Sequence, residues 1–299
     1  MSRIDVLIPH YRDVAGLAMS IASVERQTIS SVVRVVVYDD GSPGKMVSAV
    51  QDLLAESPLS TVLIQGRENR GRPYARNQLI DAIESKYAAW LDAGDAWYPE
   101  KLEKQLDALY RVRVSGKNVE DVLVTCHYDW VQSGRKPQLK NQVTDKDQLQ
   151  ALLIGTTLRA YLWTLFGLAE TYRSIGYFDL SLSRLQDLDY FLRFVQAGGR
   201  LITPSGRAPL CAYYKSDIGR NAREIRKCQS IIFDKYHSVI NAYGPRFVAN
   251  RHYKADLLAA RFAISNESWP EAGKYLARAF AARPSRFVND AVRKGGKPW

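Results

Sequence analysis

Two acidic clusters in the first third of the chain have the residue types needed to bind a divalent cation or a ribose. Asp39 and Asp40 precede a glycine, while Asp92 and Asp95 enclose a turn that contains Gly94. Carboxylate oxygens are the ligands that hard divalent cations prefer, and they also accept hydrogen bonds from hydroxyl and base N–H groups. A single Asp-Gly pair, however, more often only makes a turn. The residue types therefore leave a binding site and a plain turn open as interpretations.

Each acidic cluster comes directly after an apolar, strand-like segment. Predicted strands over 4–8, 32–38, 61–64 and 87–91 alternate with predicted helices over 17–27, 46–54, 72–85 and 99–114. This alternation predicts an α/β fold, a mostly parallel sheet with helices on both faces. Ligands of such sheets bind at the carboxyl ends of the strands, so both clusters are expected at one edge. Two clusters in equivalent places favour a binding site over a plain turn.

The second half of the chain has a less regular pattern. It predicts one strand over 122–131, a loop over 132–146 and a helix over 187–196 that ends at Gly198 and Gly199. After Tyr214 the sequence becomes basic and helical. We therefore predict a catalytic-type α/β domain over 1–215 and a basic helical region over 216–299. A helix pair over 253–284 resembles one tetratricopeptide-like unit, which must pack on the first domain or on a partner.

The charge of the chain suggests anionic partners. The net charge is +11, and from Arg251 to the end ten Lys or Arg face four acids, a surplus of +6. Such a surface attracts phosphates and anionic lipid headgroups, or is simply a solvated face. Nucleic-acid binding has no support beyond net charge, and we predict none. Three dispersed cysteines, no signal peptide and no long apolar run predict a cytoplasmic protein with peripheral contact at the inner membrane face.

Seven segments of the chain, taken in order, resemble glycosyltransferase family 2, whose members invert the anomeric centre and have the GT-A fold. Together they span residues 4–200, about two thirds of the chain. Each segment alone is a weak signal, whereas their common order and strand–loop–helix context make a strong one. The segments are VLIPHYRD, SVERQT, VVVYDDGSP, ENRGRPYARNQLIDA, YAAWLDAGDAWYPEKLEKQ, GYFD and QDLDYFLRFVQAGGR.

The resemblance implies a nucleotide-sugar site and assigns residues to it. Residues beside the first strand and after the second hold the base, the start of the 72–85 helix closes over the nucleotide, and the acidic turn binds ribose. The implied nucleotide-binding residues are Pro9, Tyr11, Asp39, Asp40, Gly71, Arg76 and Asp92.

The resemblance also assigns a metal ligand and a catalytic base. Asp95 would bind Mg²⁺ or Mn²⁺, which neutralises the charge that develops on the diphosphate leaving group. Asp187 would take the proton of the attacking hydroxyl, and such a base contributes about 10²–10⁴-fold to a rate. Asp187 could instead only cap its helix, and Asp189 is a competing candidate. We favour Asp187 because of its position in the motif.

Three positions depart from the family pattern. Gln186 replaces the usual glutamate before Asp187, and a neutral amide there removes a like-charge neighbour, which should favour the ionised form of Asp187. Gly94 stands where the family usually has an acid, so it is either a turn residue or a sign of weakened metal dependence. Arg12 replaces the usual asparagine, either as an exposed side chain or as a contact to the donor phosphate. His127, Trp130 and Trp163 could line an acceptor cleft or be structural.

We therefore predict an inverting glycosyltransferase. It moves a sugar from a nucleotide-diphosphate donor, UDP in our prediction, to a hydroxyl of a saccharide or lipid-linked acceptor in bacterial-type surface polysaccharide synthesis. The alternative is a non-catalytic GT-A subunit that binds a nucleotide or a partner protein. A nucleotidyltransferase and a dinucleotide-dependent dehydrogenase are disfavoured because no glycine-rich loop follows the first strand.

Overall fold

The computed structural model describes residues 3–214 and 221–293, which form two compact units. The first unit comprises Met1–Leu180 and Asp187–Lys215. The second comprises Ser181–Gln186 and Ser216–Trp299. The second unit therefore takes in a short segment that lies far ahead of residue 216 in the sequence. The assignment of catalysis to residues 1–215 stays a prediction.

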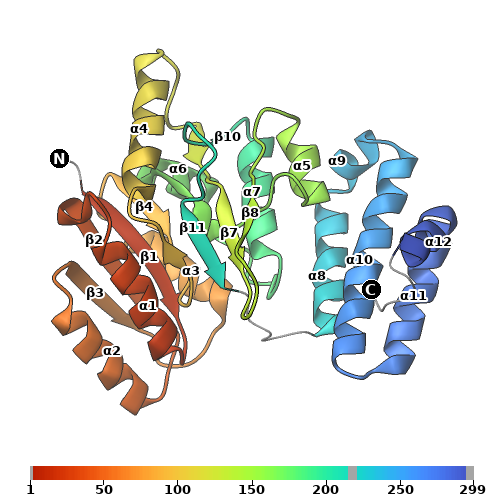
Figure 1. Ribbon diagram of the computed structural model, residues 1–299, viewed down its shortest axis with the longest axis horizontal. Helices are drawn as coiled ribbons and strands as arrows, with labels where there is room; N and C mark the ends of the chain where they lie inside the picture. The colour runs from red at the N-terminus through yellow and green to blue at the C-terminus, as the bar shows by residue number, and fades with distance from the viewer. Residues whose placement is uncertain (1–2, 215–220, 294–299) are drawn as a thin grey trace. The chain divides into compact units, whose positions relative to one another are not determined.

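A seven-stranded sheet forms the centre of the first unit (Figure 1). Strand β1 pairs in parallel with β2 and β4, and β2 pairs in parallel with β3. The carboxyl ends of these four strands therefore lie at one edge, as the sequence predicts. Every residue of β1 and β2 is buried, which explains why most of their side chains are apolar. In sheet order the strands are β10 (Arg200–Ile202), β6 (Val122–Val124), β9 (Phe166–Leu168), β4 (Tyr87–Trp90), β1 (Ile4–His10), β2 (Val33–Asp39) and β3 (Ser60–Gln65).

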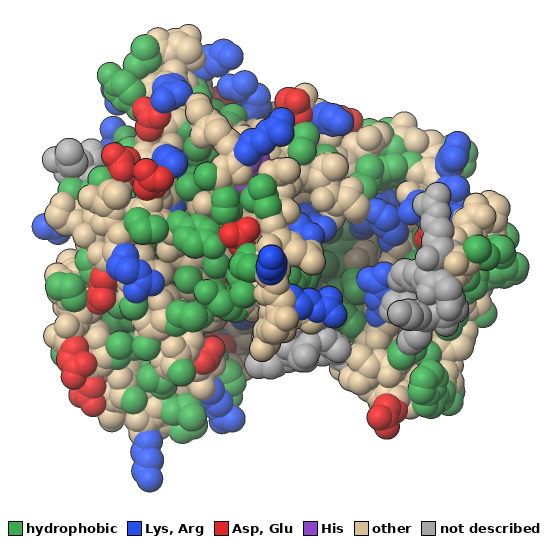
Figure 2. Space-filling view, viewed as in Figure 1, with side chains coloured by type: hydrophobic (Ala, Val, Ile, Leu, Met, Phe, Trp, Pro, Cys, Tyr) green, Lys and Arg blue, Asp and Glu red, His purple; other side chains and the backbone are tan. Residues whose placement is uncertain are grey.

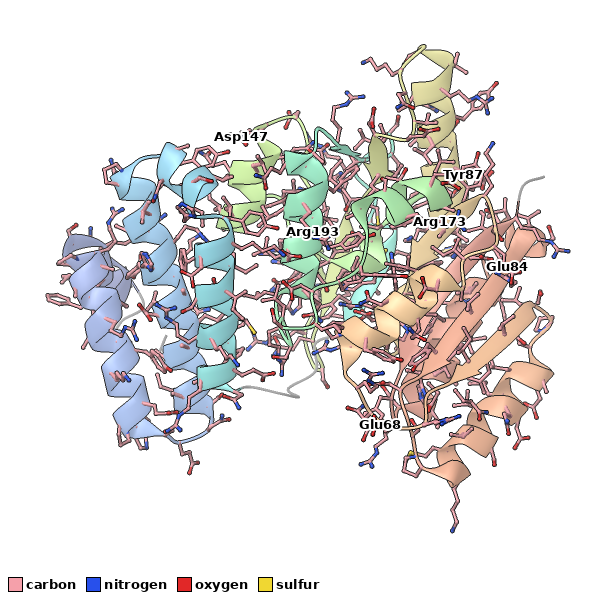
Figure 3. All side chains as sticks on the ribbon, turned by 180° about the vertical axis from the view of Figure 1, so that it is seen from behind. Glu68, Glu84, Tyr87, Asp147, Arg173 and Arg193 are labelled. Atoms are coloured by element: carbon pink, nitrogen blue, oxygen red, sulfur yellow. The ribbon has the colours of Figure 1, made fainter. Side chains whose placement is uncertain are left out.

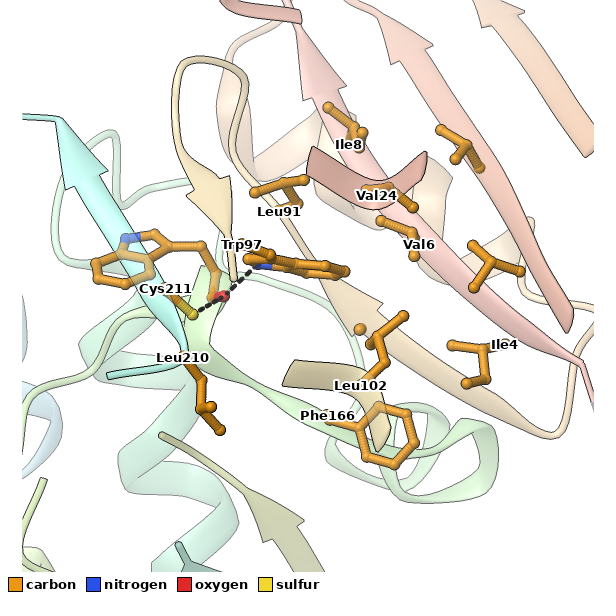
Figure 4. Packing of buried hydrophobic residues seen from close by; sticks show 14 of the residues in the cluster. Ile4, Val6, Ile8, Val24, Leu91, Trp97, Leu102, Phe166, Leu210 and Cys211 are labelled. Carbon is orange, nitrogen blue, oxygen red and sulfur yellow. Dashed lines mark hydrogen bonds between the residues drawn. The ribbon is translucent and has the colours of Figure 1, made fainter. Parts of the chain in front are cut away.

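Helices cover both faces of this sheet. The chain moves outward from β1 to β3, which places α1 (Val14–Glu25) and α2 (Gly44–Glu56) on one face. It then returns past β1 to β4, so α3 (Arg72–Asp81) lies on the other face (Figure 1). Helix α4 (Lys101–Val114) packs against β6 and β9. The apolar core between sheet and helices includes Trp97, whose Nε1 donates to the Trp163 carbonyl at 3.1 Å (Figure 4).

A second sheet corrects two predictions. The single strand predicted over 122–131 is two strands, β6 and β7 (Tyr128–Val131), which belong to different sheets. At the break between them, Thr125 N–H donates to Ile202 and the His127 carbonyl accepts from Leu210. The break cannot be recognised in the sequence because residues 122–126 and Tyr128 are all buried, so the apolar pattern continues across it. The predicted loop contains β8 (Gln138–Lys140), and β5 (Ala96–Trp97) and β11 (Cys211–Tyr214) complete the sheet.

Three further helices belong mainly to the first unit: α5 (Gln148–Ile154), α6 (Ala169–Ile175) and α7 (Gln186–Gln196). Helix α7 matches the predicted helix over 187–196. Gly198, with φ of 95°, follows its end in the left-handed region that favours glycine. Two short 3₁₀ helices, Ser30–Val32 and Leu162–Thr164, connect the other elements.

The second unit is helical within its described residues. Helices α10 (Pro245–Ser265) and α11 (Trp269–Ala282) are the predicted pair, and α10 also packs on α8 (Ala222–Lys235). Small side chains such as Ala259 and Ala263 let these helices approach closely. Helices α9 (His237–Ala242) and α12 (Pro284–Arg293) complete the unit. None of the described helices is both long and apolar enough to cross a bilayer.

Some of the cations counted in residues 251–299 are buried or paired with an acid. Arg251 is buried, and burial lowers its pKa to about 10. Arg286 is paired with Asp290 at 3.5 Å. Lys294 and Lys297, which also contributed to the count, lie outside the described residues. Fewer cations are therefore free to meet an anionic membrane than the count of ten indicates.

A buried ion pair stabilises the amino edge of the central sheet, opposite the acidic clusters. Figure 3 shows Glu84 and Tyr87 at this edge and Glu68, which follows β3, at the other. The Asp5 carboxylate accepts from Arg34 Nη2 at 2.7 Å, from Ser85 Oγ at 2.6 Å and from the Glu84 N–H at 2.8 Å. Burial alone raises the pKa of Asp5, but these hydrogen bonds outweigh it and lower the pKa.

We expect Asp5→Asn to reduce the free energy of unfolding at pH 7 by about 2 kcal/mol, since hydrogen bonds to a charged group are lost. A lowered native pKa gives stability that is present above the unfolded pKa, near 3.9, and is lost as pH falls through the native value. The difference from wild type should therefore shrink below about pH 4. Urea titrations at pH 7 and pH 3 measure it, with the exposed Asp52→Asn as control; an equal loss at both pH values would contradict the assignment.

Candidate active site

Both acidic clusters lie at the carboxyl edge of the central sheet. Asp39 is the last residue of β2 and pairs in register with His10, the last residue of β1. Asp92 follows the neighbouring β4, whose continuation is held to β1 by a 3.1 Å bond from the Leu91 N–H to the Leu7 carbonyl. The parallel pairing of β1 with β2 and β4 thus brings the clusters together, as the sequence predicts.

The Asp39 carboxylate is oriented by a histidine that the sequence analysis did not identify. His10 Nε2 accepts from the Asp13 N–H at 3.2 Å, so the ring proton is on Nδ1. His10 Nδ1 therefore donates to Asp39 Oδ2 at 2.7 Å, while Asp39 Oδ1 accepts from the Ser42 N–H at 2.7 Å. Each oxygen keeps one lone pair for a ligand N–H. The β1–β2 register is the signal that could have found His10.

Asp40 joins two loops rather than facing outward. Its carboxylate accepts from the Arg70 N–H at 3.0 Å and from the Gly71 N–H at 2.8 Å. Burial raises the pKa of Asp40, these two N–H groups oppose the rise, and the charge of Asp39 adds to it. Gly71 has φ of 88°, a left-handed conformation that favours glycine. Asp40 and Gly71 thereby position the start of α3.

Arg76 connects the acidic turn to the predicted base. Its side chain is 1% exposed, and Nη2 donates to the two Asp92 carboxylate oxygens at 3.1 and 3.3 Å. Its Nη1 donates to Asp187, which is 111 positions away in the sequence. Nε of Arg76 has no hydrogen-bond partner among the described residues. The guanidinium of Arg76 thus lies between the carboxylates of Asp92 and Asp187 and binds both.

The two candidate bases occupy different environments. Asp189 is fully buried and forms an ion pair with Arg193 at 3.0 Å, so it is occupied within the helix. The Asp187 side chain keeps 21% exposure at the carboxyl edge. Burial raises the pKa of Asp187, the charge of Arg76 opposes the rise, and the charge of Asp92 adds to it. Of the two, Asp187 has the accessibility that a general base needs.

Asp95 is suited to bind a cation together with ligands from a substrate. It is 5% exposed, and its Oδ1 accepts from the Tyr214 N–H at 3.1 Å. Burial, assisted by the charge of Asp92, raises the pKa of Asp95 well above its usual value, so a cation at this carboxylate would be favourable. The described residues contain no cluster of three or more His, Cys, Asp or Glu with metal-site geometry. Mg²⁺, however, commonly takes one or two carboxylates plus substrate phosphates and water, and Asp95 fits that arrangement.

The backbone explains Gly94, which departs from the family pattern. Its φ is 94°, a conformation that strains any residue with a side chain. Its N–H donates to the Gly16 carbonyl and to Ser20 Oγ, each at 3.1 Å. Gly94 is therefore a turn residue whose N–H is already used within the protein.

The residues at the end of β1 differ in exposure: Pro9 is buried, whereas Tyr11 and Arg12 are exposed. Pro9 is buried within β1, in register with Tyr38. Tyr11 is 39% exposed, and the guanidinium of Arg12 lies 4.9 Å from its ring. Tyr11 is therefore the residue of this group whose ring is free to stack on a base. Arg12 is exposed and has φ of 57°, with its N–H donating to Ser42 Oγ.

The rings of Trp130, Tyr213 and Tyr161 form an aromatic row near Asp95. The Tyr213 ring stacks on Tyr161 with centroids 6.0 Å apart and meets the edge of Trp130 at 5.4 Å. The nearby Trp163 is buried, and His127 Nδ1 accepts from the Gln142 N–H, so both are structural. The sequence analysis missed Tyr161 and Tyr213 because nothing in their local pattern shows that they meet.

An α/β sheet of this topology, with acids at the carboxyl ends of β2 and β4, has the GT-A-type fold. Residues 5–156 match the family described as glycosyl transferase family 2. The chain belongs to glycosyl transferase family 2.

Several relatives share part of this sequence. An uncharacterized glycosyltransferase of Rickettsia typhi is 26% identical over 204 residues, which cover 64% of this chain and 58% of the relative. The succinoglycan biosynthesis protein ExoW of Rhizobium meliloti is 32% identical over 37% of this chain and 35% of its own. The chain thus spans less than two thirds of the length of these relatives. An Escherichia coli protein named UDP-Glc:alpha-D-GlcNAc-diphosphoundecaprenol beta-1,3-glucosyltransferase is 25% identical, over 38% of this chain and 43% of its own.

Solved structures of Staphylococcus aureus TarS share the fold. The chain aligns with one TarS structure at a TM-score of 0.61 and 18% identity, over 95% of this chain and 50% of that one. A TarS fragment in complex with UDP-GlcNAc aligns at a TM-score of 0.60 and 16% identity, over 95% and 82% of the two chains. At these identities the likeness shows the fold alone.

Proposed function

We propose that this protein is an inverting glycosyltransferase that uses a UDP-sugar and a saccharide or lipid-linked acceptor in surface polysaccharide synthesis. The observation that carries the proposal is the Arg76 bridge, which holds Asp187 beside the acidic turn at the carboxyl edge. Membership of family 2 supports the class of reaction. The UDP-GlcNAc bound to TarS and the names of the relatives support the donor and the process.

The proposed mechanism is a single displacement. The acceptor oxygen forms a bond to the anomeric carbon while the bond from that carbon to the diphosphate oxygen breaks. Asp187 takes the acceptor proton, and its raised pKa makes it a stronger base than an exposed aspartate. Attack on the face opposite the leaving group inverts the configuration, so one base suffices.

The chain's other residues bind and orient the donor in this mechanism. Tyr11 and Asp39 hold the base, with Asp39 oriented by His10. Asp92, held by Arg76, accepts from the ribose hydroxyls. Asp95 would hold Mg²⁺ or Mn²⁺, which when bound neutralises charge on the diphosphate leaving group.

A panel of nucleotide-sugars tests this proposal. We expect UDP and one UDP-sugar to bind the protein with Mn²⁺ present, by isothermal titration calorimetry, and the sugar to be slowly released as a β-product or by hydrolysis. Asp95→Asn should weaken Mn²⁺ binding to the UDP complex about tenfold, measured by the Mn²⁺ electron paramagnetic resonance signal. Absence of binding by any nucleotide-sugar would refute the proposal. Binding without turnover of any donor would favour a non-catalytic GT-A subunit.

Membrane contact through the basic C-terminal region stays a prediction. Its support is the net charge of +6 in residues 251–299, although Arg251 is buried. If the acceptor is lipid-linked, such contact would bring the enzyme to the membrane that holds the acceptor.

A further inference from the structure

A concave, basic pocket lies on the second sheet of the first unit. Its volume is about 320 Å³, and it is formed by the β7–β8 hairpin and the segment before Tyr161. Figure 2 shows Lys and Arg side chains on the face that carries this hairpin. The lining residues are Trp130, Gln132, Arg135, Lys136, Gln138, Lys140 and Arg159.

The charged side chains that line this pocket are all positive. Four of the residues that line it are Lys or Arg, and none is an acid. In the described part of the chain, these four cations make no ion pair with a carboxylate. Lys140 Nζ donates to Gln138 at 3.1 Å, and Arg159 donates to the Gly155 carbonyl and to Tyr128 Oη at 3.1 and 2.8 Å. Four cations around one hollow repel one another, so a bound anion would be favourable.

The aromatic row connects this pocket to the proposed active site. Trp130 forms one wall of the pocket and contacts Tyr213, which stacks on Tyr161. Burial raises the pKa of Tyr213 to about 12, and the charges of Asp95 and Asp92 contribute to the rise. Burial likewise raises the pKa of Tyr161, and the charge of Asp187 contributes. Tyr213 also precedes Tyr214 on β11, and the Tyr214 N–H donates to Asp95 Oδ1 at 3.1 Å, so this end of the aromatic row lies beside an acid of the proposed active site.

We propose that this pocket binds the phosphate or pyrophosphate group of an anionic acceptor, with the acceptor sugar lying along Trp130, Tyr213 and Tyr161 toward Asp187. Guanidinium and ammonium groups provide the charge-assisted hydrogen bonds that phosphate oxygens accept. Aromatic faces and edges provide the apolar surface that a sugar ring covers. The donor diphosphate is expected elsewhere, at the acids that follow β2 and β4. This inference rests on the proposed function and adds the chemical class of the acceptor.

A pair of matched charge reversals tests the pocket. Arg135→Glu/Lys140→Glu alters the pocket, whereas Arg113→Glu/Lys117→Glu makes the same change in charge at exposed positions around the end of α4. The probe is inorganic pyrophosphate, titrated calorimetrically in EDTA with excess UDP present. We expect the pocket variant to lose about tenfold or more in pyrophosphate affinity and the control to stay within about twofold. Equal losses in both variants, or full displacement of pyrophosphate by UDP, would overturn the proposal.

Acceptor kinetics then test whether the pocket recognises the phosphate group of an acceptor. With a short-chain prenyl pyrophosphoryl sugar and a neutral alkyl glycoside of the same sugar, only the charged acceptor should show a raised KM in the pocket variant, with kcat unchanged. An equal increase in KM for both acceptors would show that the pocket does not bind the phosphate group. Pocket-dependent binding of a single-stranded oligonucleotide, tighter than that of pyrophosphate, would replace the proposal with a nucleic-acid site.

Failure of the pocket and failure of the proposed function give different results. If wild-type protein binds no UDP-sugar, the glycosyltransferase proposal fails, whatever pyrophosphate does. If UDP binding is normal in both variants and pyrophosphate affinity is unaffected, only the pocket proposal fails. Should the charge reversal impair folding, as judged by circular dichroism, Arg135→Gln/Lys140→Gln replaces it with the same expected direction.

Discussion

Asp187→Asn is expected to lower kcat by about 10²–10⁴-fold while the Kd for UDP stays within about threefold of wild type. The amide keeps the shape of the side chain but cannot accept the proton of the attacking hydroxyl. Steady-state kinetics and calorimetric titration of UDP measure the two quantities separately. Asp107→Asn, an exposed position on α4, is the matched control and should leave both unchanged. A variant that kept full kcat would show that Asp187 is not the base.

The pH profile provides a second test of the same residue. A base must be unprotonated to act, so activity falls as pH drops through its pKa. Because burial raises the pKa of Asp187, the acid limb of kcat/KM should lie above the value of about 3.9 that is ordinary for aspartate. In Asp187→Asn the residual activity should lose this limb.

Arg76→Met is expected to reduce the free energy of unfolding by about 3 kcal/mol, at the lower end of the range for breaking a buried ion pair. The lower end applies because the side chains of Asp92 and Asp187 are 27% and 21% exposed, so water can partly solvate them. Without the guanidinium these acids repel each other at neutral pH. Urea denaturation at pH 7 measures the loss.

A double-mutant cycle separates this charge effect from lost packing. Arg76→Met/Asp187→Asn should lose less stability than the sum of the two single variants, because the amide removes one of the stranded charges. The loss in Arg76→Met should also shrink as pH falls and the acids take up protons. Additive losses with no pH dependence would mean that Arg76 stabilises the fold only by packing.

The elements that position the donor site follow from short-range pattern. Residues 33–38 are mostly apolar because both faces of a parallel strand are buried, and β2 ends at Asp39, where the chain enters a polar turn. The same logic places Asp92 after β4. The apolar pattern gives a wrong prediction at residues 122–131. Buried residues continue there from β6 into β7, so the local periodicity does not show that the two strands belong to different sheets.

Only the tertiary structure could decide which distant side chains meet. Arg76 and Asp187 lie 111 positions apart, and His10 and Asp39 meet through the β1–β2 register. Residues 130–140 and Arg159 make one pocket only after the second sheet has formed.

The α/β class, the sheet edge at which the acidic clusters lie and the family can all be recognised in the sequence. The tertiary structure decided how those acids are held: Asp39 by His10, Asp92 and Asp187 by Arg76, and Asp95 by the Tyr214 N–H. The two kinds of information differ because they depend on interactions of different sequence range. Burial and turn formation leave a periodic trace in neighbouring residues, whereas an ion pair between distant segments depends on how the whole chain packs.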